Sequence, residues 1–126
     1  MIPRDGVLLR IFISESDKHQ ALPLYEWIVK KARETGMAGA TVLRGMQGFG
    51  AHSRMHTAKI LRLSQDLPIV IELVDTPEKI EAFIPIIDPV IEEGLMTTER
   101  IHVRFYRTSH KKEKTIAEQD NTPDKT

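Results

Sequence analysis

The order of strand-like and helix-like apolar patterns along the sequence constrains the fold of this chain more than any other feature. Four short segments are rich in β-branched residues, as strands are, and two longer segments repeat their apolar residues every three to four positions, as helices do. In chain order the predicted elements are strand 7–13, helix 23–36, strand 40–44, strand 69–74, helix 77–94 and strand 101–106. The order βαββαβ predicts a ferredoxin-like α+β sandwich, in which an antiparallel four-stranded sheet carries both helices on one face.

Local signals mark the ends of the two predicted helices. A proline stands at the first position of each helix, where its missing N–H is not needed, and Gly36 and Gly94 are the expected C-terminal stops. In the second helix, Pro85 and Pro89 remove internal hydrogen bonds. We therefore expect the second helix to bend or break.

The length and the charge of the chain exclude several classes of protein. A chain of 126 residues predicts one domain, residues 1–107, followed by a disordered charged tail, residues 108–126, which has almost nothing to bury. Eighteen Lys and Arg balance eighteen Asp and Glu, so no net charge attracts the chain to nucleic acid. The apolar runs are far shorter than the ~20 residues that span a bilayer, so we expect no direct membrane insertion. The absence of cysteine fits a reducing compartment, and we expect the protein to be cytoplasmic.

Alternation along the strands separates the two faces of the predicted sheet. We expect Leu9 and Ile11 of the first strand, and Ile101, Val103 and Phe105 of the last strand, to point toward the helices. The residues expected on the opposite, helix-free face mix apolar and charged side chains: Leu8, Arg10, Phe12, Val70, Glu72, Val74, His102, Arg104 and Tyr106. This face is too apolar for water and too charged for a core. It therefore predicts an interface between subunits, in which the arginines and the glutamate pair across chains.

Two other interpretations of the helix-free face stay open. A monomer with a semi-polar exposed sheet would need no partner copy. An RNA-binding module would stack bases on the sheet aromatics Phe12 and Tyr106. The aromatic–glycine strand pattern of such modules is missing and the net charge is zero, so we expect no nucleic-acid partner.

The glycine-rich stretch after the second predicted strand carries a resemblance to a known family. The segment 39–54 reads GATVLRGMQGFGAHSR, and it stands between PLYE at 23–26 and DLPIVIE at 66–72. Together these segments resemble an uncharacterised PII-like family, domain of unknown function 190, over nearly all of residues 7–106. Through that family the chain is more distantly similar to the PII nitrogen-regulatory signalling proteins, whose second strand is likewise followed by Gly-Phe-Gly, here Gly48-Phe49-Gly50.

The resemblance implies an assembly, a ligand and a partner. PII proteins are ferredoxin-like trimers that bind adenine nucleotides in clefts between subunits and present a long loop after the second strand to a partner. For this chain the resemblance implies a homotrimer, an adenine nucleotide as ligand and a membrane transporter or channel as the regulated partner. The chain departs from PII proteins in two places: it has Ala-His-Ser-Arg at 51–54 in place of Arg-Gln-Lys-Gly, and 93–100 lacks the lysines of the PII phosphate-contacting turn.

The glycines and the basic residues of this stretch make up the predicted ligand site. Glycine lets backbone N–H groups approach an anion, and arginine adds positive charge. The residues assigned to ligand binding are Arg44, Gly45, Gly48, Phe49, Gly50, His52, Arg54, His56 and Arg62. The alternative is that the glycines only permit a bulge or a tight turn. The weak periodicity of 51–64 leaves two interpretations open: a long mobile loop, or a frayed strand extension around residues 60–63.

Neither metal binding nor catalysis is indicated by the candidate residues. His52 and His56 are four residues apart, which on a helix would place both rings on one face for a divalent ion. No cysteine assists them and the charge of Arg54 repels a cation, so we expect no metal site. Ser53 is adjacent to His52, and no carboxylate is placed to orient a catalytic triad. We therefore predict no enzymatic activity, and no cofactor beyond the nucleotide.

Two classes of function remain. In the first, the chain is a signalling protein in which a small anion in an intersubunit cleft orders the loop 51–64 and changes its fit to the partner. In the second, a structural or interaction trimer presents the same loop constitutively, without a ligand. Protease protection of the loop distinguishes the two classes, because it rises with added ligand only in the first.

Overall fold

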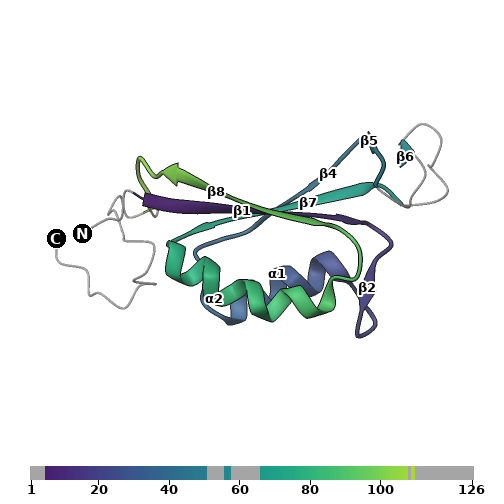
Figure 1. The fold of residues 1–126 in the computed structure, drawn as a ribbon, viewed down its shortest axis with the longest axis horizontal. Coiled ribbons are helices and arrows are strands. Elements are labelled where there is room, and N and C mark those ends of the chain that lie inside the picture. Colours follow the sequence, from purple (N-terminus) through teal and green to yellow (C-terminus); the bar gives the residue numbers. More distant parts are fainter. Residues whose placement is uncertain (1–4, 51–55, 58–65, 108, 110–126) are drawn as a thin grey trace.

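A computed structural model of the chain describes residues 5–50, 56–57, 66–107 and 109. Two helices, α1 (Leu24–Glu34) and α2 (Pro77–Ile87), lie together on one face of a four-stranded sheet (Figure 1). The strands are antiparallel and have the spatial order β4-β7-β1-β8, where β1 is Asp5–Ser14, β4 is Thr41–Arg44, β7 is Pro68–Asp75 and β8 is Leu95–His102. The predicted ferredoxin-like α+β sandwich is confirmed.

Shorter elements connect these layers. The strands β2 (Lys18–His19) and β3 (Leu22–Pro23) form a hairpin between β1 and α1. The strands β5 (Gln47–Gly48) and β6 (His56–Thr57) pair beyond the end of β4, where they extend away from the helices (Figure 1). A 3-10 turn, η1 (Asp88–Val90), follows α2.

The β2–β3 hairpin turns through two residues with left-handed backbone. The φ angle is 52° at Gln20 and 65° at Ala21. Turns of this kind favour Asn-Gly, because other L residues are strained at positive φ. The hairpin packs on α1 through an edge-to-face contact between His19 and Trp27, whose ring centroids are 4.8 Å apart. We infer that this packing offsets the strain of the turn.

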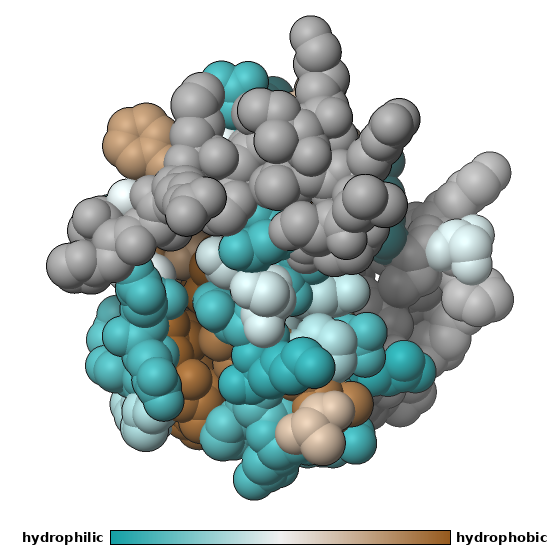
Figure 2. Space-filling model, turned by 90° about the vertical axis from the view of Figure 1, so that its right-hand side faces the viewer, coloured by the Kyte–Doolittle hydropathy of each residue, from teal (hydrophilic) through white to brown (hydrophobic). Residues whose placement is uncertain are grey.

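The hydrophobic core lies between the sheet and the two helices. Every second residue from Leu9 to Ile13 of β1 and from Ile69 to Asp75 of β7 faces the helices and is buried, as the alternation predicts. The helices meet this face with side chains three to four residues apart: Leu24, Ile28 and Ala32 from α1, and Ile80, Phe83 and Ile87 from α2. Figure 2 views the end of the molecule near the β2–β3 hairpin and shows apolar side chains set back between hydrophilic ones. Burial of this apolar surface is the main force that holds the layers together.

The second helix is shorter than the sequence predicts. Its start is as expected, because Thr76 caps it by accepting a hydrogen bond from the Lys79 N–H at 3.2 Å. Pro85 lies inside the helix, but Pro89 falls in the 3-10 turn beyond the helix end, so the expected break occurs there. Gly94 is therefore not the helix stop. A Cβ atom at Gly94 would lie 2.5 Å from the carbonyl oxygen of Phe12, so glycine is needed there for the close approach to β1.

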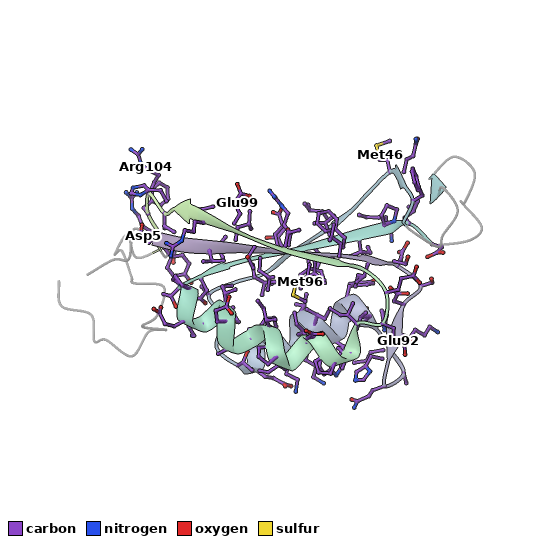
Figure 3. All side chains as sticks on the ribbon, viewed as in Figure 1. Asp5, Met46, Glu92, Met96, Glu99 and Arg104 are labelled. Atoms are coloured by element: carbon purple, nitrogen blue, oxygen red, sulfur yellow. The ribbon has the colours of Figure 1, made fainter. Side chains whose placement is uncertain are left out.

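The last strand lies earlier in the sequence than predicted, at Leu95–His102 instead of 101–106. As an edge strand it carries mostly exposed polar residues, so its apolar alternation is weak. Its pairing with β1 sets Ile101 opposite Gly6 and His102 opposite Asp5, which is the reverse of the faces we expected for these two residues. Figure 3 shows Met96 directed toward the helices and Glu99 directed away from them.

Parts of the predicted loop and tail lie outside the described residues. These are 51–55 and 58–65 of the loop, and 108 and 110–126 of the tail, so the boundary of the domain at residue 107 stays a prediction. Within the part of the chain that the structure describes, neither helix has the length and apolar character needed to cross a bilayer.

Candidate functional site

The helix-free face carries a charged network at its centre. The register of β1 and β7 sets Arg10 directly opposite Glu72. The Arg10 Nε donates a hydrogen bond of 2.9 Å to Glu72, and its Nη1 lies 3.5 Å from a carboxylate oxygen of Glu99 on β8. The hydrogen bond to Glu72 raises the pKa of Arg10 above its usual value. We expected these charges to pair across chains, but the antiparallel register pairs them within one chain.

Apolar residues flank this network on the same face. Leu8 lies opposite Val74, and Phe12 lies opposite Val70. Phe12 is about a third exposed, at 36 %, and Leu95, opposite Phe12 on β8, is 57 % exposed. The face therefore combines accessible apolar side chains with a charge network whose arginine is already paired.

The residues predicted for this face at the end of the chain are placed differently. His102 ends β8 and lies opposite Asp5, on the side that the register gives to the helices. Arg104 lies beyond the strand, at the end of the sheet where β1 begins and near Asp5 (Figure 3). Tyr106 also lies beyond the strand, and its ring contributes to a pocket described next.

A pocket of about 330 Å³ lies between the beginning of β4, the end of β7 and the residues that follow β8. Its lining residues are mostly small or apolar: Ala38, Gly39, Ala40, Thr41, Glu72, Val74, Val103, Phe105 and Tyr106. Glu72 is the charged side chain among them, and Thr41 adds a hydroxyl group. Apolar walls with a few polar groups are typical of sites that bind small molecules, and the volume lies at the lower end of their usual range.

One wall of the pocket is a turn that three other segments hold. The N–H of Ala38 donates a hydrogen bond of 2.8 Å to the carboxylate of Asp75. The side chain of Lys79 donates to the carbonyl oxygen of Gly36, and the hydroxyl of Tyr106 donates to the carbonyl oxygen of Ala38 at 3.0 Å. Burial raises the pKa of the Asp75 carboxyl, although its backbone hydrogen bonds act in the opposite direction. The turn is therefore held from inside by Asp75 and from outside by Tyr106.

Gly39 keeps this wall open. A Cβ atom built at Gly39 would meet no heavy atom within 4 Å in the described part of the chain, and its φ does not lie in the left-handed region. In contrast, Gly36 three residues earlier has a φ of 80°, which favours glycine. Backbone conformation therefore explains the glycine at 36, whereas neither conformation nor packing in the described part of the chain explains the glycine at 39, which lines the pocket.

The residues predicted to bind a ligand lie at the other end of β4. The Arg44 guanidinium donates to the Glu15 carboxylate, so its charge is paired. The N–H of Gly45 donates to the Pro68 carbonyl oxygen at 2.7 Å, and a Cβ at Gly45 would lie 2.8 Å from the Pro68 ring. Gly45 therefore serves the close approach to β7, which favours the structural alternative for this glycine.

The remaining predicted ligand residues surround the same end. Gly48 belongs to β5 and pairs with His56 of β6, and Phe49 is 75 % exposed. Gly50 follows Phe49, whereas His52, Arg54 and Arg62 lie outside the described residues. In this single chain the described members of the predicted set do not line the pocket. Across the described ranges, no three histidine, aspartate or glutamate side chains gather as metal ligands.

The sequence analysis missed most of the pocket lining. The sequence places residues 40 and 41 in the strand 40–44 and Phe105 on the core side, and it assigns Glu72, Val74 and Tyr106 to a subunit interface instead of a ligand site. The pocket brings residues 103–106 against residues 38–41, more than sixty positions away in the sequence. No local periodicity reports such a contact. The small-residue run before Thr41 was the one available signal.

Comparison with known proteins shows which family the chain belongs to. Residues 6–103 match the family model described as "Uncharacterized ACR, COG1993", the domain of unknown function 190, so the chain is a member of this family. The chain is 38 % identical over 98 residues to a UPF0166 protein of Aquifex aeolicus, with coverage of 78 % of this chain and 92 % of that protein. It is 36 % identical over 97 residues to a UPF0166 protein of Methanocaldococcus jannaschii, with coverage of 76 % and 89 %.

Solved structures with the same fold include PII-like proteins. One is CPII, a nitrogen regulatory PII-like protein from Thiomonas intermedia K12, bound to ADP, AMP and bicarbonate. It has a TM-score of 0.62 and 20 % identity, and the match covers 79 % of this chain and 88 % of that one. CutA1 from Oryza sativa has a TM-score of 0.52 and 7 % identity, with coverage of 82 % and 84 %. These likenesses confirm the resemblance to PII-like proteins at the level of the fold.

Proposed function

We propose that this chain is a PII-like sensor that binds an adenine nucleotide and regulates a partner through the loop after β4. The observation that carries the proposal is the pocket between β4, β7 and residues 103–106, because it lies on the helix-free face and has the composition of a small-molecule site. Support comes from the fold, which this chain shares with a PII-like protein described as bound to ADP and AMP.

The lining of the pocket suits a flat base. Val74 and Val103 offer apolar surface, and the aromatic rings of Phe105 and Tyr106 offer faces on which a base can stack. The hydroxyl of Thr41 and the backbone groups of Gly39 and Ala40 supply donors and acceptors for the polar edge of adenine, whereas the N–H and the carbonyl oxygen of Ala38 already bond to Asp75 and Tyr106. The carboxylate of Glu72 repels anions, so we assign the base to the pocket and the phosphates to its outside.

The phosphates then need cationic partners from elsewhere. No lysine or arginine is among the described residues that line the pocket. We propose that the basic residues of the loop after β4, Arg54 and Arg62 among them, meet the phosphates in the assembled protein. Ordering of the loop by these contacts is the signal that a partner would recognise, and we propose a membrane transporter or channel as that partner. The setting is the cytoplasm, where such nucleotides are available.

The assembly that we propose is a homotrimer built on the helix-free face. Leu8, Phe12, Val70 and Val74 form its apolar part, and burial of this surface favours association. Since Val74 also lines the pocket, a neighbouring copy on this face would complete the pocket wall. The pairing of Arg10 with Glu72 and Glu99 removes the cost of burying an unpaired arginine there.

A ligand-independent interaction trimer is the second candidate. One observation favours it: Met46 and Phe49, at the far end of β4, are 79 % and 75 % exposed, so an apolar contact surface is present without any ligand. In this case the loop would be equally sensitive to protease with and without nucleotide.

Calorimetric titration separates the two candidates. We expect ADP and adenosine to bind and inorganic pyrophosphate alone to bind more weakly than ADP, because the pocket holds the base. We also expect ADP to protect the loop 51–64 from protease. No heat at millimolar ADP, with the protein still assembled, would exclude the nucleotide site and leave the ligand-independent trimer.

A further inference from the structure

The five residues that follow β8, 103–107, cross the end of the sheet and supply part of the pocket wall; we call them the strap. Val103 is buried and packs on Gly6, where its Cγ2 would lie only 3.0 Å from a Cβ atom. Glycine at this position therefore lets the strap cross close to the start of β1. Val103, Phe105 and Tyr106 of the strap all line the pocket.

The far end of the strap is held by a polar contact. The Tyr106 hydroxyl donates to the carbonyl oxygen of Ala38 at 3.0 Å, across 68 positions of sequence. The other side of the same turn is fixed, because the Ala38 N–H donates to the buried carboxylate of Asp75. Tyr106 therefore attaches the strap to a turn that is itself hydrogen-bonded to the end of β7 through Asp75.

Between these two attachments the strap has little burial. Phe105 is 57 % exposed, and its ring carries the guanidinium of Arg107 at 4.1 Å from the centroid. An exposed aromatic ring beside an apolar pocket gains burial when a flat molecule enters the pocket. A bound base would therefore contact the strap and the turn at the same time.

We propose that Tyr106 latches the strap across the pocket, and that nucleotide binding and closure of the latch reinforce each other. Tyr106 is then a positioning residue: it holds Phe105 and its own ring in place as a wall for the base. The coupling between nucleotide binding and closure of the strap rests on the proposed nucleotide site. The closure of the strap by the Tyr106 hydrogen bond does not. Because binding stabilises the closed strap, the population of the closed strap rises with the ligand.

Limited trypsin digestion of the full chain tests the latch without any ligand. Arg104 and Arg107 lie in the strap, so mass spectrometry of the cleaved bonds reports its opening. Tyr106→Phe keeps the ring and removes the hydrogen bond. The loss of one such hydrogen bond shifts the equilibrium between the closed and the open strap by about fivefold. We expect cleavage at the two strap bonds to become about fivefold faster in Tyr106→Phe. Tyr25→Phe, the matched change on α1, and cleavage after Lys31 in α1 should both stay at the wild-type rate.

Repeating the digestion with ADP tests the linkage. In the wild-type protein ADP should slow cleavage of the strap. The Tyr106→Phe variant should need up to about fivefold more ADP for half-protection, because a smaller fraction of its molecules has the strap closed before ADP binds. A general loss of stability would instead raise cleavage after Lys31 as well, and that result would overturn the positioning role.

The outcomes separate the two hypotheses. Equal strap cleavage in wild type and Tyr106→Phe without ligand would overturn the latch. Equal half-protection by ADP in both proteins would overturn the linkage. No protection of the wild-type strap by ADP would overturn the proposed nucleotide site and the linkage with it, while the ligand-free rates would still decide the latch.

Discussion

Gly39 offers the sharpest perturbation of the proposed site. Substitution by alanine or valine adds atoms beside the pocket, and a Cβ atom there meets nothing within 4 Å in the described part of the chain. The backbone at Gly39 does not lie in the left-handed region, so the substitution is not strained. Removing a glycine from such a position stabilises a protein by about 0.4–1 kcal/mol, through the unfolded state. Gly39→Ala should therefore be as stable as wild type or slightly more so.

Ligand binding should respond in the opposite direction. Inserting methyl groups into occupied space costs about 1–3 kcal/mol, which corresponds to a loss in affinity between about 5-fold and 150-fold. We expect Gly39→Val to weaken ADP binding within this range and Gly39→Ala to weaken it less. The assay is calorimetric titration with ADP, together with chemical denaturation followed by the fluorescence of Trp27, the single tryptophan.

Gly36→Ala is the matched control in the same turn. The φ of Gly36 is 80°, so alanine should cost about 1–2 kcal/mol of stability there. Its affinity for ADP should stay unchanged, because Gly36 does not line the pocket. Wild-type ADP affinity in Gly39→Val would refute the assignment of the pocket to the nucleotide. Loss of assembly in Gly39→Val with unchanged ADP affinity would show that the space at Gly39 serves a partner copy instead.

Three further predictions test the account at other points. Ala21→Gly should stabilise the protein by about 0.5–1 kcal/mol in denaturation followed by Trp27, because glycine relieves the strain of a φ of 65° but loses more chain entropy; a destabilised variant would contradict this. Because burial raises the pKa of Asp75, the folded chain binds this proton more tightly than the unfolded chain, so the free energy of unfolding of wild type relative to Asp75→Asn should increase as the pH falls toward about 4. Parallel pH profiles for the two proteins would show that Asp75 has no such shift. Arg10→Glu sets three carboxylates together on the helix-free face and should dissociate the assembly in sedimentation, whereas Arg33→Glu on α1 should not; dissociation by both changes, or by neither, would argue against this interface.

The sequence predicted the layers of this fold because the core obeys simple periodicity. Ile69, Ile71 and Leu73 alternate along β7, and Ile28 follows Leu24 by one helical turn on α1, so each face could be assigned before the structure was known. The pattern failed at β8, where both faces of an edge strand are largely exposed and Thr97 and Thr98 carry no hydrophobic signal.

The candidate site was less accessible to sequence reasoning, because it depends on contacts between distant segments. The hydrogen bond from Tyr106 to Ala38 and the packing of Val103 on Gly6 are set by where the chain crosses the sheet, and no local pattern encodes them. The register of β1 and β7 sets Arg10 opposite Glu72, because register decides whether two charges on neighbouring strands lie opposite each other. A register prediction would have paired Arg10 with Glu72 inside one chain.

A crystal structure of the full-length protein grown with ADP tests the central claim most directly. The account predicts electron density for adenine against Thr41, Val74 and Phe105, in a pocket that a second copy of the chain completes on the helix-free face. A structure in which ADP lies elsewhere, or in which that face is exposed to solvent and the pocket is empty, would contradict it.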